Sequence, residues 1–184
     1  MRILAVSGSL RAESYNTALA RAAAALAPDG IDVELYAGLA WIPPYDADGD
    51  GEEPPAAVED LRERIGEAGG LLVVTPEYNG SIPGVLKNAI DWASRPHRES
   101  ALWGKTVAIA GATTGQYGAI WAQQDLRRVL GMAGARVVDG EVPVPRAHEK
   151  FDAEGRLVDP LLAERLRAHV DALVAEASPV VLAA

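Results

Sequence analysis

Cysteine is absent from the 184-residue chain. Its absence excludes disulfide bonds, thiolate metal sites and a cysteine nucleophile, and it is typical of a protein from a reducing compartment. Histidine is scarce: His97, His148 and His169 lack the spacing of metal ligands, and the chain contains no Gly-x-Ser-x-Gly sequence. We therefore expect no metal site, and neither zinc-dependent nor serine-dependent hydrolysis.

Long apolar runs and basic clusters are also missing. The apolar run at residues 1–6 is too short for a signal peptide, and no stretch reaches the roughly 20 apolar residues of a membrane helix. The net charge is −9, whereas proteins that bind nucleic acid usually present a basic face. These features predict a cytoplasmic protein that binds neither membranes nor nucleic acid. Residues 29–60 hold ten acidic residues and no Lys or Arg, so an anionic ligand is expected nearer the N-terminus.

Short runs of β-branched and aliphatic residues alternate with longer helical patterns. The predicted strands are Ile3 to Val6, Ile31 to Tyr36, Gly70 to Val74, Thr106 to Gly111 and Ala135 to Val144, and the predicted helices cover 14–27, 56–68, 84–94, 117–133 and 160–177. This alternation is typical of βαβ units around a parallel sheet. We predict one α/β domain over residues 1–184, with a flavodoxin-like, doubly wound, five-stranded parallel sheet of order 2-1-3-4-5 and helices on both faces. The acidic, Pro-rich stretch 41–55 is predicted to be a long loop.

Two local patterns resemble functional motifs without the required context. Residues 46–51 copy the first half of a calcium-binding EF-hand loop, but Ala57 stands where the bidentate Glu is required and prolines flank the segment. Residues 104–106 resemble the end of a phosphate-binding P-loop, but they precede a predicted strand instead of opening a helix. We expect neither calcium nor a nucleoside triphosphate to bind at these segments.

The loop after the first predicted strand contains several hydroxyl groups and one basic side chain. Its candidate binding residues are Ser9, Arg11, Ser14, Asn16 and Thr17. Hydroxyls and a guanidinium beside a helix N-terminus suit a phosphate dianion, and the lack of a dinucleotide-type glycine pattern favours a monophosphate over a pyrophosphate. The alternative is that Ser14 merely caps the helix and Arg11 is solvated.

Two further loops follow the predicted strands at 70–74 and 106–111. In the first, Asn79-Gly80 predicts a turn with positive φ, and Tyr78 offers a flat aromatic face. In the second, the small residues of 112–118 leave backbone N–H groups accessible. Each loop also has a purely structural interpretation, an ordinary turn in the first and a helix start capped by Thr114 in the second. Because ligands of such sheets bind beyond the carboxyl ends of the strands, a phosphate site, an aromatic face and exposed amides together indicate flavin mononucleotide, FMN.

The sequence resembles the flavodoxin-like NAD(P)H-dependent FMN reductases, a family that includes quinone, chromate and azo-dye reductases. The resemblance rests on three segments: residues 8–16, residues 76–92 and residues 113–118. It implies that the first loop binds the FMN phosphate and that the other two surround the isoalloxazine ring through Pro76, Glu77, Tyr78, Asn79, Gly80, Thr113, Gly115 and Gln116. Ser81 also matches the family motif, without an implied role. Trp121 is a departure, because many relatives have Arg there.

The resemblance implies an enzyme that passes a hydride from NADPH or NADH to flavin N5, and then electrons to a quinone, a free flavin, an azo compound or a similar small acceptor. No protein residue is assigned as general acid or base, because the cofactor carries the chemistry. We expect a homodimer or homotetramer, with Trp41, Trp92, Trp103 and Trp121 in the core or in subunit contacts. The alternatives are a flavodoxin-type electron carrier without its own nicotinamide reaction, and a non-catalytic nucleotide-binding module.

Overall fold

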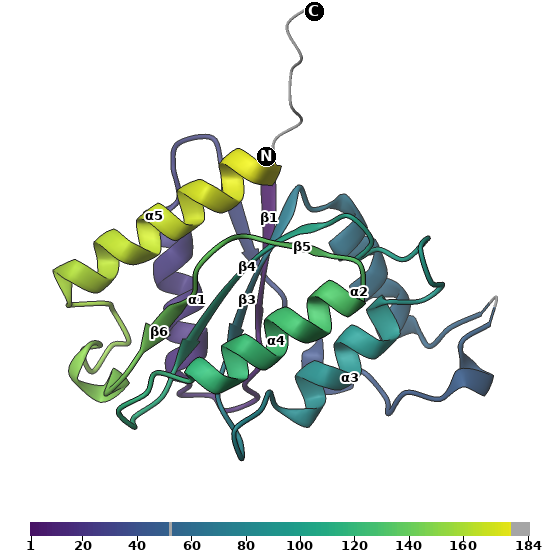
Figure 1. Ribbon diagram of the computed structural model, residues 1–184, viewed down its shortest axis with the longest axis horizontal. Coiled ribbons are helices and arrows are strands. Elements are labelled where there is room, and N and C mark those ends of the chain that lie inside the picture. The colour runs from purple at the N-terminus through teal and green to yellow at the C-terminus, as the bar shows by residue number, and fades with distance from the viewer. Residues whose placement is uncertain (52, 178–184) are drawn as a thin grey trace, which may run out of the picture.

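The computed structural model describes residues 1–51 and 53–177. In this part of the chain six parallel strands form one sheet: β1 (Arg2–Ser7), β2 (Asp32–Leu35), β3 (Gly70–Thr75), β4 (Thr106–Ala112), β5 (Arg136–Val137) and β6 (Val142–Val144). The strand order is β2-β1-β3-β4-β5, and β6 also pairs with β4 (Figure 1). This order confirms the predicted flavodoxin-like sheet.

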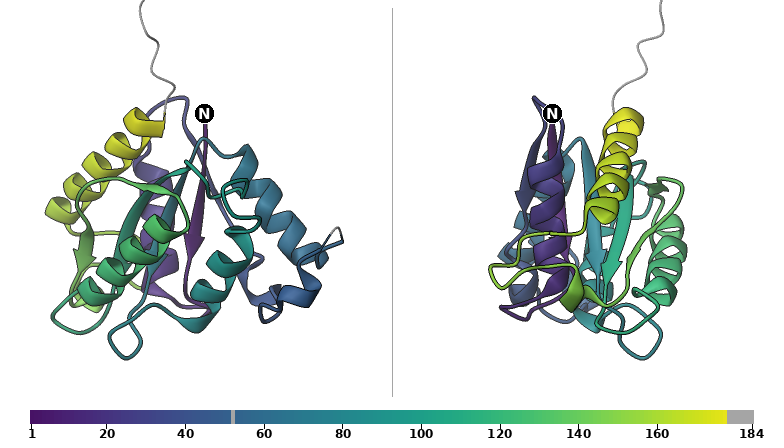
Figure 2. Two further views of the ribbon diagram at one scale, coloured as in Figure 1. Left: turned by 45° about the vertical axis from the view of Figure 1, so that its right-hand side comes forward. Right: turned by 90° about the vertical axis from the view of Figure 1, so that its left-hand side faces the viewer.

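Helices cover both faces of the sheet, as predicted (Figure 2). They are α1 (Tyr15–Leu26), α2 (Ala56–Glu67), α3 (Gly84–Ala93), α4 (Ile120–Met132) and α5 (Pro160–Ala177). Side chains of α1 and α5 pack on one face, and those of α2, α3 and α4 pack on the other. None of the described helices is long and apolar enough to cross a membrane.

The central strands β3 and β4 are buried at every position, which explains their continuously apolar sequences. Successive side chains of β3 enter opposite layers: Leu71 and Val73 pack against the α2–α4 side, whereas Leu72 and Val74 pack against the α1–α5 side. Burying a side chain of this size stabilises the fold by roughly 1.5–3 kcal/mol. This two-sided packing holds β3 in the middle of the sheet.

The single strand predicted over Ala135 to Val144 is wrong in one respect, because the structure divides it into β5 and β6. The chain leaves the sheet at the exposed Asp139 and Gly140, where Gly140 has a φ of +80°. Arg127 of α4 donates hydrogen bonds to the carbonyl oxygens of Val138 and Gly140, both at 2.8 Å. These carbonyls are therefore satisfied by a side chain, and the backbone does not need a continuous strand here.

The predicted long loop 41–55 contains two short 3₁₀ turns, η1 (Leu39–Trp41) and η2 (Ala47–Gly49). Side chains of α3 hold it: the amide of Asn88 and the indole Nε1 of Trp92 both donate to the Pro43 carbonyl oxygen at 2.8 Å. Trp92 is 1% exposed and belongs to the core. The second half of the 76–92 motif therefore anchors this loop.

The imidazole of His169, on α5, is buried, and its Nε2 has no hydrogen-bond partner among the described residues. Burial lowers the pKa of His169 from its ordinary value of 6.5, with the charges of Arg127 and Glu141 as smaller influences. The unfolded chain therefore binds a proton at this position at a higher pH than the folded chain does. We expect the free energy of unfolding to decrease as the pH falls below about 6.5.

The contribution of His169 is measured by urea unfolding of the wild type and His169→Gln between about pH 7.5 and about pH 5.5. Glutamine has no proton to bind in this range, so the variant should lose less stability than the wild type as the pH falls. Parallel pH profiles would show that His169 titrates alike in the folded and unfolded chains.

Candidate active site

The carboxyl ends of β1, β3 and β4 lie together toward the bottom of Figure 1. The segments that follow these strands, with the first turn of α1, enclose a cavity of about 110 Å³. Its lining residues are Ser9, Arg11, Ser14, Tyr15, Asn16, Pro76, Glu77, Tyr78, Ala112 and Thr113. Eight of the thirteen predicted site residues are among them. The sequence analysis missed Tyr15 and Ala112.

Arg11 is the only basic residue that lines this cavity. Its guanidinium makes no ion pair or hydrogen bond with any described residue, while its backbone N–H donates to Ser9 Oγ at 3.4 Å. Ser14 caps α1 and accepts from the Asn16 backbone N–H at 3.2 Å, so its hydroxyl hydrogen is still free to donate. The other N–H groups in the first turn of α1 have no acceptor within the helix. A free cation, hydroxyls and open N–H groups fit a phosphate dianion.

Asn16 and Thr17, both predicted to bind phosphate, have protein partners in the structure. The Asn16 side chain forms two hydrogen bonds with the backbone of Ala112, donating at 3.0 Å and accepting at 2.9 Å. It thereby joins α1 to the end of β4, and it also lines the cavity. The Thr17 hydroxyl lies 2.9 Å from the hydroxyl of Ser7 and is not among the lining residues.

The loop after β3 forms a tight hairpin. Tyr78 and Ser81 exchange two backbone hydrogen bonds, of 3.0 and 3.1 Å, around Asn79 and Gly80. These two residues have φ values of +53° and +75°, as predicted from the Asn-Gly pair. Both are exposed, and Tyr78 is 51% exposed. The hairpin therefore presents an aromatic ring and the backbone of its tip beside the cavity.

The loop after β4 runs alongside the segment that follows β6. Thr113 donates its N–H to the Val144 carbonyl oxygen at 3.1 Å, and its own carbonyl oxygen accepts from Ala147 at 3.0 Å. Thr113 lines the cavity, whereas Gly115 and Gln116 lie on the exposed part of the loop. The helix predicted over 117–133 begins at Ile120, so the alternative interpretation of this loop, a helix start capped by Thr114, does not hold.

A carboxylate from the hairpin accepts a hydrogen bond from the first turn of α4. Ala119, the residue before α4, has a φ of +60° and no side-chain cap. Glu77 Oε2 instead accepts the backbone N–H of Ala122 at 3.2 Å. A carboxylate at a helix N-terminus is favoured by the unpaired N–H groups and by the helix dipole. The loops after β3 and β4 are therefore connected through the start of α4.

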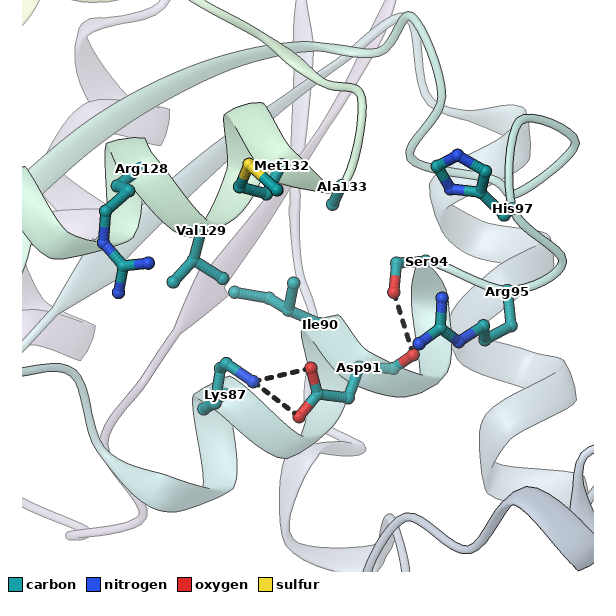
Figure 3. Close-up of a pocket in the computed structure, with 10 residues that line it drawn as sticks. All are labelled: Lys87, Ile90, Asp91, Ser94, Arg95, His97, Arg128, Val129, Met132 and Ala133. Atoms are coloured by element: carbon teal, nitrogen blue, oxygen red, sulfur yellow. Dashed lines mark hydrogen bonds and ion pairs between the residues drawn. The ribbon is translucent and has the colours of Figure 1, made fainter.

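A larger groove lies between α3 and α4, with a volume of about 230 Å³ (Figure 3). None of the predicted site residues lines it. Its Lys87 is paired with Asp91 one helical turn away, with Nζ–O distances of 2.7 and 2.8 Å. This groove is larger than the cavity at the carboxyl edge of the sheet, but position at that edge favours the smaller cavity.

Comparison with known proteins identifies the family. The family model described as NADPH-dependent FMN reductase matches residues 1–149. The chain belongs to this family. As a member of the FMN reductase family it is an oxidoreductase enzyme, with FMN as its cofactor and NAD(P)H as its reductant.

Individual relatives agree with this membership. An NAD(P)H-dependent FMN reductase of Pseudomonas aeruginosa is 44% identical over 174 residues, which cover 94% of this chain and 93% of the relative. A quinone reductase of Escherichia coli K12 is 43% identical over 140 residues, covering 76% of this chain and 74% of the relative. The structure of FerB, a flavoenzyme NAD(P)H:(acceptor) oxidoreductase from Paracoccus denitrificans, matches with a TM-score of 0.86 and 34% identity over 96% of both chains.

Proposed function

We propose that the protein transfers a hydride from NADPH or NADH to the N5 atom of bound FMN and passes the electrons to a quinone or a similar small acceptor. The observation that carries this proposal is the meeting of three loops at one cavity, with a free guanidinium on one side and an exposed aromatic hairpin on the other. When bound, FMN supplies the hydride acceptance and the subsequent electron release. The protein supplies binding, orientation and electrostatics.

The phosphate would bind at the first loop. Arg11 donates from a planar guanidinium, which matches phosphate oxygens better than a single ammonium does. The hydroxyls of Ser9 and Ser14 and the N–H groups of the first turn of α1 add further donors, with Asn16 and Thr17 in the same turn. The only carboxylate that lines the cavity belongs to Glu77, and its Oε2 is occupied by the Ala122 N–H. Repulsion of the phosphate is thereby limited.

The isoalloxazine ring would lie between the hairpin and the loop after β4. Pro76, Tyr78, Asn79 and Gly80 would contact it from one side, and Thr113, Gly115 and Gln116 from the other. Open backbone N–H groups in these loops would stabilise negative charge on the reduced ring. No residue is assigned as general acid or base, because orientation and electrostatic stabilisation are sufficient for hydride transfer between two bound cofactors.

A quinone acceptor is supported by exposed aromatic side chains near the loops. Tyr78 of the hairpin and Tyr117 of the loop after β4 are 51% and 54% exposed. Flat aromatic faces bind flat conjugated molecules by stacking. Relatives named 2-hydroxy-1,4-benzoquinone reductase, from a Burkholderia species, and quinone reductase, from Escherichia coli, agree with such a substrate class.

The proposal includes assembly as a homodimer or homotetramer. Several large apolar side chains are exposed in the single chain, among them Trp41, Trp103, Trp121 and Met132. Exposed aromatic and Met residues are enriched in protein interfaces. Light scattering of the purified protein measures the assembly directly.

The redox reaction is tested by mixing the purified flavoprotein with NADPH or NADH without oxygen. We expect the flavin absorbance to bleach with at least one nicotinamide and to return when a quinone is added. A flavin that stays oxidised with both nicotinamides would instead support a flavodoxin-type carrier. A purified protein that is colourless and does not bind added FMN would support a non-catalytic nucleotide-binding module. Steady-state assays with quinone, free flavin and azo-dye acceptors then define the second substrate.

A further inference from the structure

The hairpin beside the cavity is attached to α4 on both sides of its tip. Glu77, before the tip, accepts the Ala122 N–H at 3.2 Å. Ser81, after the tip, donates its hydroxyl to Asp125 Oδ2. Ala122 and Asp125 are three residues apart, so they lie on the same side of α4. The residues between the anchors, Tyr78 to Gly80, are among those proposed to contact the isoalloxazine ring.

Asp125 is well suited to act as a fixed acceptor. Its carboxylate receives the Ser81 hydroxyl, the guanidinium of Arg128 at 2.6 Å and the backbone N–H of Ile82. The Ser81 hydrogen bond, followed by that of Arg128, lowers the pKa of Asp125 below its ordinary value. The side chain is therefore charged at neutral pH, and hydrogen bonds to a charged acceptor are stronger than those between neutral groups.

The tip of the hairpin has few other contacts, although the buried Pro76 and Ile82 hold its two ends. Asn79 and Gly80 are exposed, and a Cβ atom at Gly80 would have no neighbour within 4 Å. Two backbone hydrogen bonds define the hairpin internally, but they do not orient it relative to the sheet. An unanchored hairpin samples several orientations, and a ligand that needs one of them binds more weakly in proportion to its population.

We propose that Asp125 is a positioning residue, which holds the hairpin tip against the flavin ring through its hydrogen bond with Ser81. This inference rests on the proposed placement of the ring and gives Ser81 a role in the family motif. The anchor acts on the ring and not on the phosphate. Loss of this hydrogen bond should therefore weaken the binding of FMN and of riboflavin equally.

The experiment compares Ser81→Ala, Asp125→Asn and the double variant with the wild type. Fluorescence titration of the apo-protein should show about 10-fold weaker binding of both flavins in Ser81→Ala, the change expected for one charge-assisted hydrogen bond, and a smaller loss in Asp125→Asn, whose amide oxygen still accepts from Ser81 without the charge. The double variant should lose no more than Ser81→Ala alone, because without the Ser81 hydroxyl the side chain at position 125 has no bond to the hairpin left to weaken. Ser81→Thr keeps the hydroxyl and should restore binding to within about 2-fold of the wild type.

Asp91→Asn is the matched control. It replaces a carboxylate by an amide on the neighbouring helix α3, where the Asp91 side chain contacts Lys87 and not the hairpin (Figure 3). It should leave the affinity for both flavins unchanged.

Amide hydrogen exchange of the apo-protein separates positioning from general destabilisation. Exchange should accelerate in residues 76–83 of Ser81→Ala and Asp125→Asn, and remain unchanged in β1 and α5. Acceleration throughout the chain, or unchanged affinity in both variants, would overturn the positioning role. A wild type that binds neither flavin would contradict the proposed function instead, since the anchor is then irrelevant to the ligand.

Discussion

Replacing Arg11 with alanine is expected to weaken FMN binding about 10- to 100-fold, because a charge-assisted hydrogen bond contributes roughly 1.5–3 kcal/mol. Arg11 is the only basic residue at the cavity of a protein with net charge −9. Its guanidinium has no hydrogen bond or ion pair with any described residue, so removing it should break no other contact within the protein. Fluorescence titration of the apo-protein measures the change.

Riboflavin, which lacks the phosphate, is the control for this prediction. Its affinity should be nearly the same for the wild type and Arg11→Ala. Arg11→Lys keeps the charge but not the planar pair of donors, so its FMN affinity should fall between those of the wild type and Arg11→Ala. If Arg11→Ala lowers the affinity for FMN and for riboflavin equally, then Arg11 contacts the ring or stabilises the fold, and the phosphate binds elsewhere.

A second large effect is expected for Gly118→Ala, which should lower the free energy of unfolding by about 2–5 kcal/mol. Gly118 has a φ of +63°, a region that costs an L-residue roughly 1–2 kcal/mol. A Cβ atom there would also lie 2.6 Å from the Val144 nitrogen and 2.8 Å from the Pro143 carbonyl carbon. Both are backbone atoms of the β6 segment, so the clash is not relieved by a side-chain rotation.

Gly115→Ala is the control in the same loop. Gly115 does not have a positive φ, and a Cβ atom added there would come no closer than 3.7 Å to its neighbours. Urea unfolding should show a change within about 0.5 kcal/mol for this variant. Equal stability of the two alanine variants would mean that the loop after β4 moves away from β6 without cost.

Features of the fold and site that depend on nearby residues were predictable from the sequence. The continuously apolar runs predicted β3 and β4, which are buried on both faces. Asn79-Gly80 predicted a turn with positive φ, and Ser14 was recognised as a helix cap. In each case the deciding interactions lie within a few residues, where sequence patterns are informative.

Other features depend on contacts between distant parts of the chain. The start of α4 was misplaced because its N–H acceptor, Glu77, lies 45 residues before Ala122. The bond between Ser81 and Asp125 spans 44 residues and leaves no local pattern. Asn16 was assigned to phosphate binding, and its contacts with Ala112 become visible only once α1 lies against β4. Such pairs require the folded structure.

The short strands β5 and β6 protect one edge of the sheet from pairing with another molecule. A continuous strand over 135–144 would present a long row of open backbone groups, which is a common starting point for aggregation. Here β5 has two residues and β6 has three, with Arg127 bound to carbonyl oxygens between them. At the opposite edge, β2 carries the charged residues Asp32 and Glu34. We therefore expect the protein to resist edge-to-edge association at high concentration and to assemble through its helices and loops instead.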